Sequence, residues 1–222
     1  MSNDKYPRTF HLPWSDGCSS DDKKLDSVDH FLSSKENLVE LIITEKLDGG
    51  NACLMSSGVY ARTHTQITTH PSFNLLKSKH ASMKHLIKPG EQIFGENCFA
   101  AHQIHYQLLP DVFFVFGIRY ENKWLSFDEM TLRCNEIGVS TVPLLFRGSV
   151  ESESKLMSLC NSHMVNPSAF GGDREGIVIR LANSFLDKDF SISVSKQVRK
   201  NHVNDGESWT TKPMMIQNIK KI

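Results

Sequence analysis

The chain has 222 residues, and its 25 Lys and Arg side chains balance 25 Asp and Glu, so the formal net charge is zero. This length suits one large domain or two small ones, and the balanced charge excludes a histone-like polycation but not a local nucleic-acid groove. No apolar run is long enough to span a bilayer, no secretory signal is expected, and five scattered cysteines predict free thiols in a reducing, cytoplasmic compartment.

The first 37 residues are polar and rich in turn signals, so we expect them to form a covering arm with little regular structure. From Leu38 the chain becomes apolar, which predicts a buried strand over 38–47. A Ser-Ser-Gly turn predicts a hairpin within 52–63. Apolar residues at helical spacing, with proline near both ends, then predict a helix over 71–87.

Strands are expected at 92–98 and at 112–120, and the second pairs with 123–125 across an Asn-containing turn. Ser126 and Glu129 form a capping-box pattern, which predicts a helix that begins there and ends at Gly138.

A further helix is expected over 151–163, followed by strands at 177–181 and 190–198 and a polar tail at 204–222. Strands outnumber helices and turns are frequent, which predicts an α+β fold of mainly antiparallel sheets. No composition shift marks a boundary, so we expect residues 1–222 to form a single domain.

The first motif that carries chemistry is Glu45-Lys46-Leu47-Asp48-Gly49-Gly50-Asn51. A Lys and an Asp two apart at a strand end point the same way, and the glycines allow a sharp turn close to a ligand. A lysine beside a carboxylate can act as a nucleophile if its pKa is lowered. An exposed turn with a salt bridge would have the same residues, so the motif alone leaves both interpretations open.

Four further motifs follow in order: Phe94-Gly95-Glu96, the aromatic run 113–116, the Glu-Gly-Ile-Val-Ile-Arg run 175–180 and the basic run 195–200. The five together resemble the covalent nucleotidyltransferase superfamily of DNA ligases, RNA ligases and mRNA capping enzymes. Residues 5–9, 11–15, 95–97, 142–145 and 196–203 make the chain more specifically similar to small ATP-dependent RNA ligases of bacteria and phages. Their catalytic domain is similar to that of the second RNA ligase of phage T4.

This resemblance implies a nucleotidyltransferase (ATP-grasp-like ligase) domain of mainly antiparallel sheets flanked by helices. No C-terminal OB-fold is expected, because the 22 residues after Lys200 are too few for a five-stranded barrel, and this length argues against a DNA ligase or a capping enzyme.

The resemblance further implies that Lys46 attacks the α-phosphate of ATP and becomes lysyl-AMP. The AMP would pass to an RNA 5′-phosphate, which is then sealed to a 3′-hydroxyl, as in RNA repair. By the same resemblance, Glu96 would hold the ribose, Phe116 would stack on adenine and Arg62 would contact the nucleotide and the RNA 5′-phosphate. The implied catalytic residues are Lys46, Asp48, Glu175 and Lys196, and the implied nucleotide contacts are Glu45, Lys46, Gly49, Asn51, Arg62, Glu96, Phe116, Glu175, Lys196 and Arg199.

Asp48, Glu96 and Glu175 match acidic residues around a hydrated catalytic metal, and carboxylate and water ligands suit Mg²⁺ or Mn²⁺. A divalent cation and nearby Lys or Arg side chains would both favour the neutral amine that Lys46 needs for attack. The chain departs from the common Lys-x-Lys ending, so Lys196, Arg199 and Lys200 remain alternatives for the contact to the α-phosphate.

Several plainer interpretations apply to the remaining residues. Phe113 and Phe114 are expected in the core, and the histidines at 102 and 105 lack a second cluster with zinc spacing. A DNA nick ligase, a capping enzyme that uses GTP and a degenerate ATP- or RNA-binding module remain alternative functions. The intact Lys46, Glu96 and Glu175 argue against the degenerate module.

Overall fold

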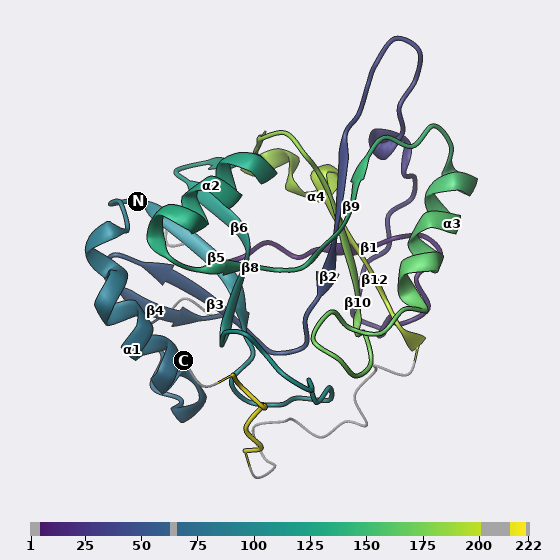
Figure 1. The fold of residues 1–222 in the computed structure, drawn as a ribbon. Helices are drawn as coiled ribbons and strands as arrows, with labels where there is room; N and C mark the ends of the chain where they lie inside the picture. Colours follow the sequence, from purple (N-terminus) through teal and green to yellow (C-terminus); the bar gives the residue numbers. More distant parts are fainter. Residues whose placement is uncertain (1–4, 63–65, 201–213, 221–222) are drawn as a thin grey trace.

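Two mainly antiparallel sheets form the framework of the computed structural model, which describes residues 5–62, 66–200 and 214–220 (Figure 1). The first sheet contains, from edge to edge, β1 (Phe10–His11), β12 (Val194–Val198), β10 (Gly176–Leu181), β2 (Leu41–Lys46) and β9 (Leu144–Gly148). The second contains β11 (Phe185–Leu186), β7 (Lys123–Trp124), β6 (Phe113–Tyr120), β5 (Glu91–Asn97), β3 (Gly50–Met55) and β4 (Gly58–Ala61), with β8 (Ser140–Thr141) beside β6. The predicted α+β fold of mainly antiparallel sheets is confirmed.

Helices cover the outer face of each sheet, as Figure 1 shows. They are α1 (Asn74–Met83) and α2 (Phe127–Ile137) on the second sheet and α3 (Glu153–Met164) on the first. The short α4 (Phe190–Ser193) lies instead where the two sheets meet, in a cluster with Phe94 of the second sheet and Val194 of the first. The predicted capping box is confirmed at the start of α2, where Ser126 and Glu129 bond reciprocally, and Gly138 ends the helix in the left-handed region at φ 73°. None of the described helices is both long and apolar enough to cross a bilayer.

Each sheet buries one face in a separate core. In the first sheet, Ile43, Ile177 and Ile179 pack with Leu156 and Cys160 of α3. The second sheet packs against α1 and α2 in the same way. Because strand side chains alternate, the neighbours of these core residues point to the opposite face. The two helix-free faces are therefore left to line a space between the sheets.

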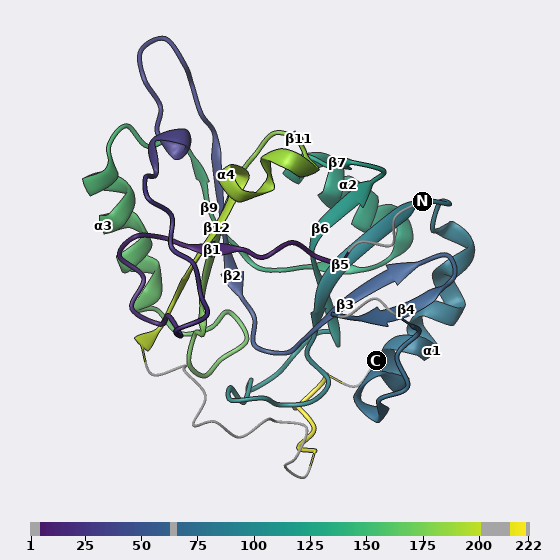
Figure 2. The same cartoon turned by 180° about the vertical axis from the view of Figure 1, so that it is seen from behind.

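The N-terminal arm has more regular structure than we predicted. Its strand β1 pairs in parallel with β12, and a 3₁₀ turn covers Asp29–Phe31. Leu12 and Phe31 are 0% exposed, because the arm packs its apolar side chains into the core of the first sheet. Figure 2 shows the arm, in purple, crossing from the second sheet to the first.

The predicted helix over 71–87 and the hairpin within 52–63 are confirmed, although residue 63 lies outside the described part. The expected strand over 190–198 is wrong in its first half. Phe190 is 3% exposed in an aromatic cluster, whereas Ile192 is 48% exposed, and the chain turns helically there. The short strands β8, β9 and β11 were not predicted. Of the expected tail at 204–222, only residues 214–220 are described.

Candidate active site

Three adjacent strands bring the two basic motifs together. In the register of β12, β10 and β2, Gly176 lies between Lys46 and Val198, and Val178 lies between Thr44 and Lys196. Because residues two apart share a face of a strand, Lys46 and Lys196 both point away from the core of the first sheet. They line a cavity of about 1390 Å³ that residues of both sheets enclose.

Lys46 ends β2 and faces an acidic wall. Its Nζ atom lies 2.5 Å from Oε1 of Glu175, and the two side chains are 27% and 6% exposed. Burial lowers the pKa of Lys46, but the charges of Glu175, Glu96 and Asp48 outweigh this and raise its pKa above the usual value. In this arrangement the amine holds its proton, so an attack by Lys46 requires these carboxylates to be neutralised.

Glu96 lies on β5 opposite Asn51 of β3. Burial raises its pKa to about 8, with Glu175 and Asp48 adding to the shift and Lys46 opposing it. Gly49 lets the two strands approach here, because a Cβ at this position would lie 2.6 Å from the carbonyl oxygen of Asn97. The crowding of acidic groups around Glu96 favours a bound cation.

Asp48 is held by a loop that the sequence did not indicate. Its Oδ2 atom accepts hydrogen bonds from the main-chain N–H of Gln103 at 2.7 Å and of Ile104 at 2.8 Å. Its own N–H donates to the hydroxyl of Tyr106 at 2.7 Å, and Nδ1 of His102 lies 3.9 Å from Oδ1. Within the described ranges, no three His, Cys, Asp or Glu side chains form a ready-made metal cluster.

Phe116 projects into the cavity at an irregularity of β6. Gly117 pairs with Phe94 and Val115 with Gly95, which leaves Phe116 unpaired in a bulge. The ring of Tyr6, from the N-terminal arm, lies edge-on to Phe116 at 4.9 Å. Phe113 and Phe114 are 0% and 1% exposed, which confirms the prediction that they lie in the core.

Most of the predicted site residues line this one cavity: Glu45, Lys46, Asp48, Gly49, Asn51, Arg62, Glu96, Phe116, Glu175 and Lys196. The Glu45 side chain points to the opposite face from Lys46, where it accepts a 2.9 Å hydrogen bond from the N–H of Ala169. Arg199 is not brought to the cavity, because it follows the end of β12 and pairs with Asp173 at 2.9 Å. Lys200 is exposed.

The cavity wall also includes arm residues that the sequence reasoning did not assign to the site. Tyr6, Arg8, His11 and Asp22 all line it. Tyr6, Arg8 and His11 fall within residues 5–9 and 11–15, whose similarity to small RNA ligases carried no role for any single side chain. No sequence signal pointed to Asp22.

A family model described as RNA ligase matches residues 39–198, which include every strand around Lys46 and Lys196 except β1. The chain belongs to the RNA ligase family. The matched range covers all five motifs up to Val198. A search of curated protein sequences found no significant match.

Solved RNA ligases have a similar fold to this family member. An archaeal ATP-dependent RNA ligase has a TM-score of 0.58 at 15% identity, over 89% of this chain and 49% of that one. A variant of the Naegleria gruberi RNA ligase with ATP and Mn has a TM-score of 0.58 at 13% identity, over 91% and 62%. The Naegleria gruberi RNA ligase with PPi has a TM-score of 0.57 at 14% identity, over 89% and 58%. This member of the RNA ligase family thus spans about half to three fifths of the length of these relatives.

Proposed function

We propose that this chain is an ATP-dependent RNA ligase that acts through lysyl-AMP on Lys46. The observation that carries the proposal is the 2.5 Å contact of the Lys46 amine with Glu175, in a cavity that Lys196 also lines. A half-buried lysine beside carboxylates that can hold a metal ion, with a second cation nearby, suits nucleophilic attack on a phosphate. The similar fold of the Naegleria gruberi RNA ligase with ATP and Mn supports ATP as the nucleotide.

The reaction would proceed in three steps. The lone pair of Lys46 Nζ attacks the α-phosphorus of ATP, a P–N bond forms, pyrophosphate leaves and the amine loses a proton. An oxygen of the RNA 5′-phosphate then attacks the same phosphorus, and the P–N bond breaks to return the lysine amine. Finally, the RNA 3′-hydroxyl attacks the 5′-phosphate, loses its proton and expels AMP, which completes a phosphodiester bond and repairs the RNA.

Different side chains of the cavity would position the Lys46 amine, the α-phosphate, the adenine and the ribose. Glu175 accepts a hydrogen bond from the Lys46 amine and orients it. We assign the contact to the α-phosphate to Lys196, since Arg199 is paired with Asp173 outside the cavity. Phe116 would stack on adenine and Glu96 would hold the ribose. Further nucleotide contacts would come from Gly49, Asn51 and Arg62 and from the main chain at Glu45, whose side chain points away from the cavity.

Glu96 and Glu175 suit Mg²⁺ or Mn²⁺, because Mg²⁺ is usually bound by one or two carboxylates together with waters and substrate phosphates. The raised pKa of Glu96 fits this role, since a cation would relieve the repulsion among the three carboxylates. When bound, the cation would supply charge neutralisation that favours the neutral Lys46 amine. Asp48 is the third proposed ligand; because its carboxylate already accepts two main-chain hydrogen bonds, we propose that it acts through water.

The intermediate is tested by intact-protein mass after incubation with ATP and Mg²⁺ and, separately, with GTP. We expect one AMP to be added with ATP alone, and the addition to be absent from Lys46→Ala. Lys200→Ala is a matched control, because this lysine is exposed and lies outside the cavity. The starting mass is read before and after pyrophosphate treatment, so that protein already carrying AMP is recognised.

Three outcomes would contradict the proposal. A GMP adduct would indicate a capping guanylyltransferase. No adduct on nucleotide-free protein, with Mn²⁺ also tried, would indicate a degenerate binding module. With the adduct established, sealing of a nicked duplex of RNA is compared with sealing of the same nick in DNA. Preference for the DNA nick would indicate a DNA ligase in place of an RNA ligase.

The five free cysteines support a reducing compartment such as the cytoplasm as the location of the protein.

A further inference from the structure

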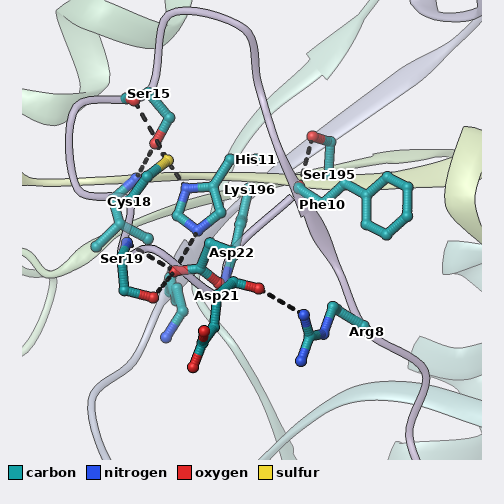
Figure 3. Close-up of polar contacts among 12 residues, drawn as sticks. Arg8, Phe10, His11, Ser15, Cys18, Ser19, Asp21, Asp22, Ser195 and Lys196 are labelled. Carbon is teal, nitrogen blue, oxygen red and sulfur yellow. Dashed lines mark hydrogen bonds and ion pairs between the residues drawn. The ribbon is translucent and has the colours of Figure 1, made fainter. Parts of the chain in front are cut away.

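The N-terminal arm is fixed to the strand that carries Lys196 (Figure 3). His11 lies opposite Lys196 in the parallel pairing of β1 with β12. The N–H of Leu12 donates to the carbonyl oxygen of Lys196 at 2.8 Å, and the Ser195 hydroxyl donates to the carbonyl oxygen of Phe10 at 2.9 Å. The arm therefore has a defined position relative to the Lys196 side chain.

Asp22 brings a carboxylate from the same arm back to this strand. Its Oδ1 atom lies 3.4 Å from Lys196 Nζ, and its Oδ2 atom lies 3.4 Å from Nε2 of His11. The main-chain N–H and the hydroxyl of Ser19 donate to Oδ2 at 3.1 Å and 2.9 Å. Figure 3 shows the carboxylate held between Ser19, His11 and Lys196.

His11 links this carboxylate to β12 a second time. The ring is 0% exposed, and burial, aided by the Lys196 charge, lowers its pKa to about 4. The ring is therefore neutral at pH 7. Its Nδ1 atom lies 2.8 Å from the hydroxyl of Ser15, and that hydroxyl oxygen accepts a 3.1 Å hydrogen bond from the N–H of Val198. In the tautomer with its proton on Nε2, the neutral ring accepts the Ser15 proton at Nδ1 and presents the Nε2–H to Asp22.

Lys196 needs a compensating charge in this place. Its side chain is 19% exposed, and burial lowers its pKa, with Lys46 acting in the same direction. Asp22 is the strongest group that opposes this shift. Burial also disfavours the charged form of Asp22, but the Ser19 hydrogen bonds and the Lys196 charge lower the pKa of Asp22 to about 2, so it is ionised at neutral pH.

We propose that Asp22 is a positioning residue for Lys196, holding its amine charged and aimed into the cavity for the α-phosphate of ATP. The inference rests on the proposed function, in which Lys196 contacts that phosphate. A lysine amine has three donors, so one can remain on Asp22 while others reach a phosphate. The arm then belongs to the active site and does not merely cover it.

The test measures the single-turnover rate of lysyl-AMP formation at saturating ATP with Mg²⁺. We expect Asp22→Asn to slow this step about tenfold, and Lys196→Met to slow it further. The double variant should match Lys196→Met alone, because a residue that acts through Lys196 has no effect once the amine is gone. Asp22→Glu, which keeps the charge, should recover part of the rate. Asp16→Asn is the matched control, since this carboxylate of the same arm is exposed and lies outside the cavity.

Two results would overturn the inference. One is a wild-type rate for Asp22→Asn. The other is the same tenfold slowing by Asp22→Asn in the Lys196→Met background, which would indicate a purely structural role. If Asp22→Asn unfolds at the assay temperature, Ser19→Ala replaces it; it removes one donor to Asp22 from an exposed residue and should give a smaller slowing with the same dependence on Lys196. Wild-type protein that forms no lysyl-AMP would refute the proposed function itself, whatever the Asp22 variants do.

Discussion

Phe114 and Phe116 lie two residues apart on β6 but have different surroundings. Phe116 lines the cavity, whereas Phe114 is 1% exposed and packs on Phe170 at 4.9 Å between ring centroids. If Phe116 stacks on adenine, Phe116→Leu should raise the KM for ATP about tenfold, because base–aromatic stacking contributes about 1–3 kcal/mol. The measurement is the rate of lysyl-AMP formation against ATP concentration.

Phe114→Leu is the contrasting variant on the same strand. It should lower the free energy of unfolding by about 1–2 kcal/mol, through lost core packing, and leave the KM for ATP unchanged. Denaturant unfolding of both variants separates the two effects. A rise in KM for Phe114→Leu equal to that for Phe116→Leu would show that the loss of either ring acts through the fold, which would contradict a direct stacking role.

The residues that the sequence could assign to the site are those whose chemistry is contained in a short motif. Lys46 and Glu175 were expected to act together, and they lie 2.5 Å apart. Asp22 and Tyr6 could not be assigned, because their place depends on pairing between segments far apart in the chain. The Ser195–Phe10 hydrogen bond, for example, joins residues separated by 185 positions.

At the scale of elements, the segment 214–220 is hydrogen-bonded to the loop whose main chain binds the Asp48 carboxylate. Gln217 is 4% exposed; its side chain donates to the carbonyl oxygen of Ile104 at 2.6 Å and accepts from the N–H of Tyr106 at 2.9 Å. Gln217→Ala would leave both main-chain groups unpaired, at a cost of about 1–3 kcal/mol each. We expect a lower free energy of unfolding in urea and slower formation of lysyl-AMP, because the loop that binds the Asp48 carboxylate would loosen.

Asn218→Ala provides the control for this prediction. Asn218 is the next residue in the segment, is exposed, and donates to the carbonyl oxygen of Gln107, which is not among the groups that bind Asp48. Asn218→Ala should change the free energy of unfolding by less than about 0.5 kcal/mol, as is usual for a surface substitution, and leave the rate of lysyl-AMP formation unchanged. The coupling of this segment to Asp48 would be refuted by a Gln217→Ala variant that is destabilised but forms lysyl-AMP at the wild-type rate.

Elements with strong local signals could be predicted, and those fixed by distant contacts could not. The α2 helix was predicted from its capping box and Gly138, both of which act within the helix itself. The α4 helix was predicted as a strand, because Phe-Ser-Ile-Ser alternates like one. The packing of Phe190 against Trp124, at 5.2 Å between ring centroids, overrides that local pattern. The strand β1 has two residues, and its pairing with β12 creates it.

At the scale of the whole molecule, the candidate site exists only where the two sheets meet. The first sheet supplies Lys46 and Lys196, and the second supplies Glu96 and Phe116. The N-terminal arm joins the two, because Tyr6 packs among aromatic rings of the second sheet while β1 pairs within the first (Figure 2). The motifs predicted most of the residues that line the cavity, and the polar N-terminal sequence predicted a covering arm, whereas the pairing of that arm with β12 was visible only in three dimensions.

The burial of His11 in this arm makes the stability of the whole molecule depend on pH. Burial and the Lys196 charge lower its pKa from 6.5 to about 4, with Asp22 opposing. As the pH falls, the unfolded chain therefore binds the proton before the folded chain does. The stabilisation that comes from keeping His11 neutral is complete above pH 6.5 and is lost as the pH falls from 6.5 to 4. The expected loss is about 3 kcal/mol, at about 1.4 kcal/mol for each pKa unit. Asp22, with a pKa of about 2, stays ionised through this window.

The measurement is urea unfolding of the wild type and of His11→Gln at intervals between pH 7 and pH 4. Burial also lowers the pKa values of His30 and His163, so both proteins should lose stability as the pH falls. The free energy of unfolding of the wild type should fall by about 3 kcal/mol more than that of His11→Gln, because the variant lacks the buried ring that binds a proton on unfolding. The gap between the two proteins is therefore widest at pH 7 and narrows towards pH 4. If the free energies of unfolding of the two proteins changed in parallel with pH, His11 would bind its proton as readily in the folded chain as in the unfolded one. That result would refute a neutral His11 ring facing Asp22.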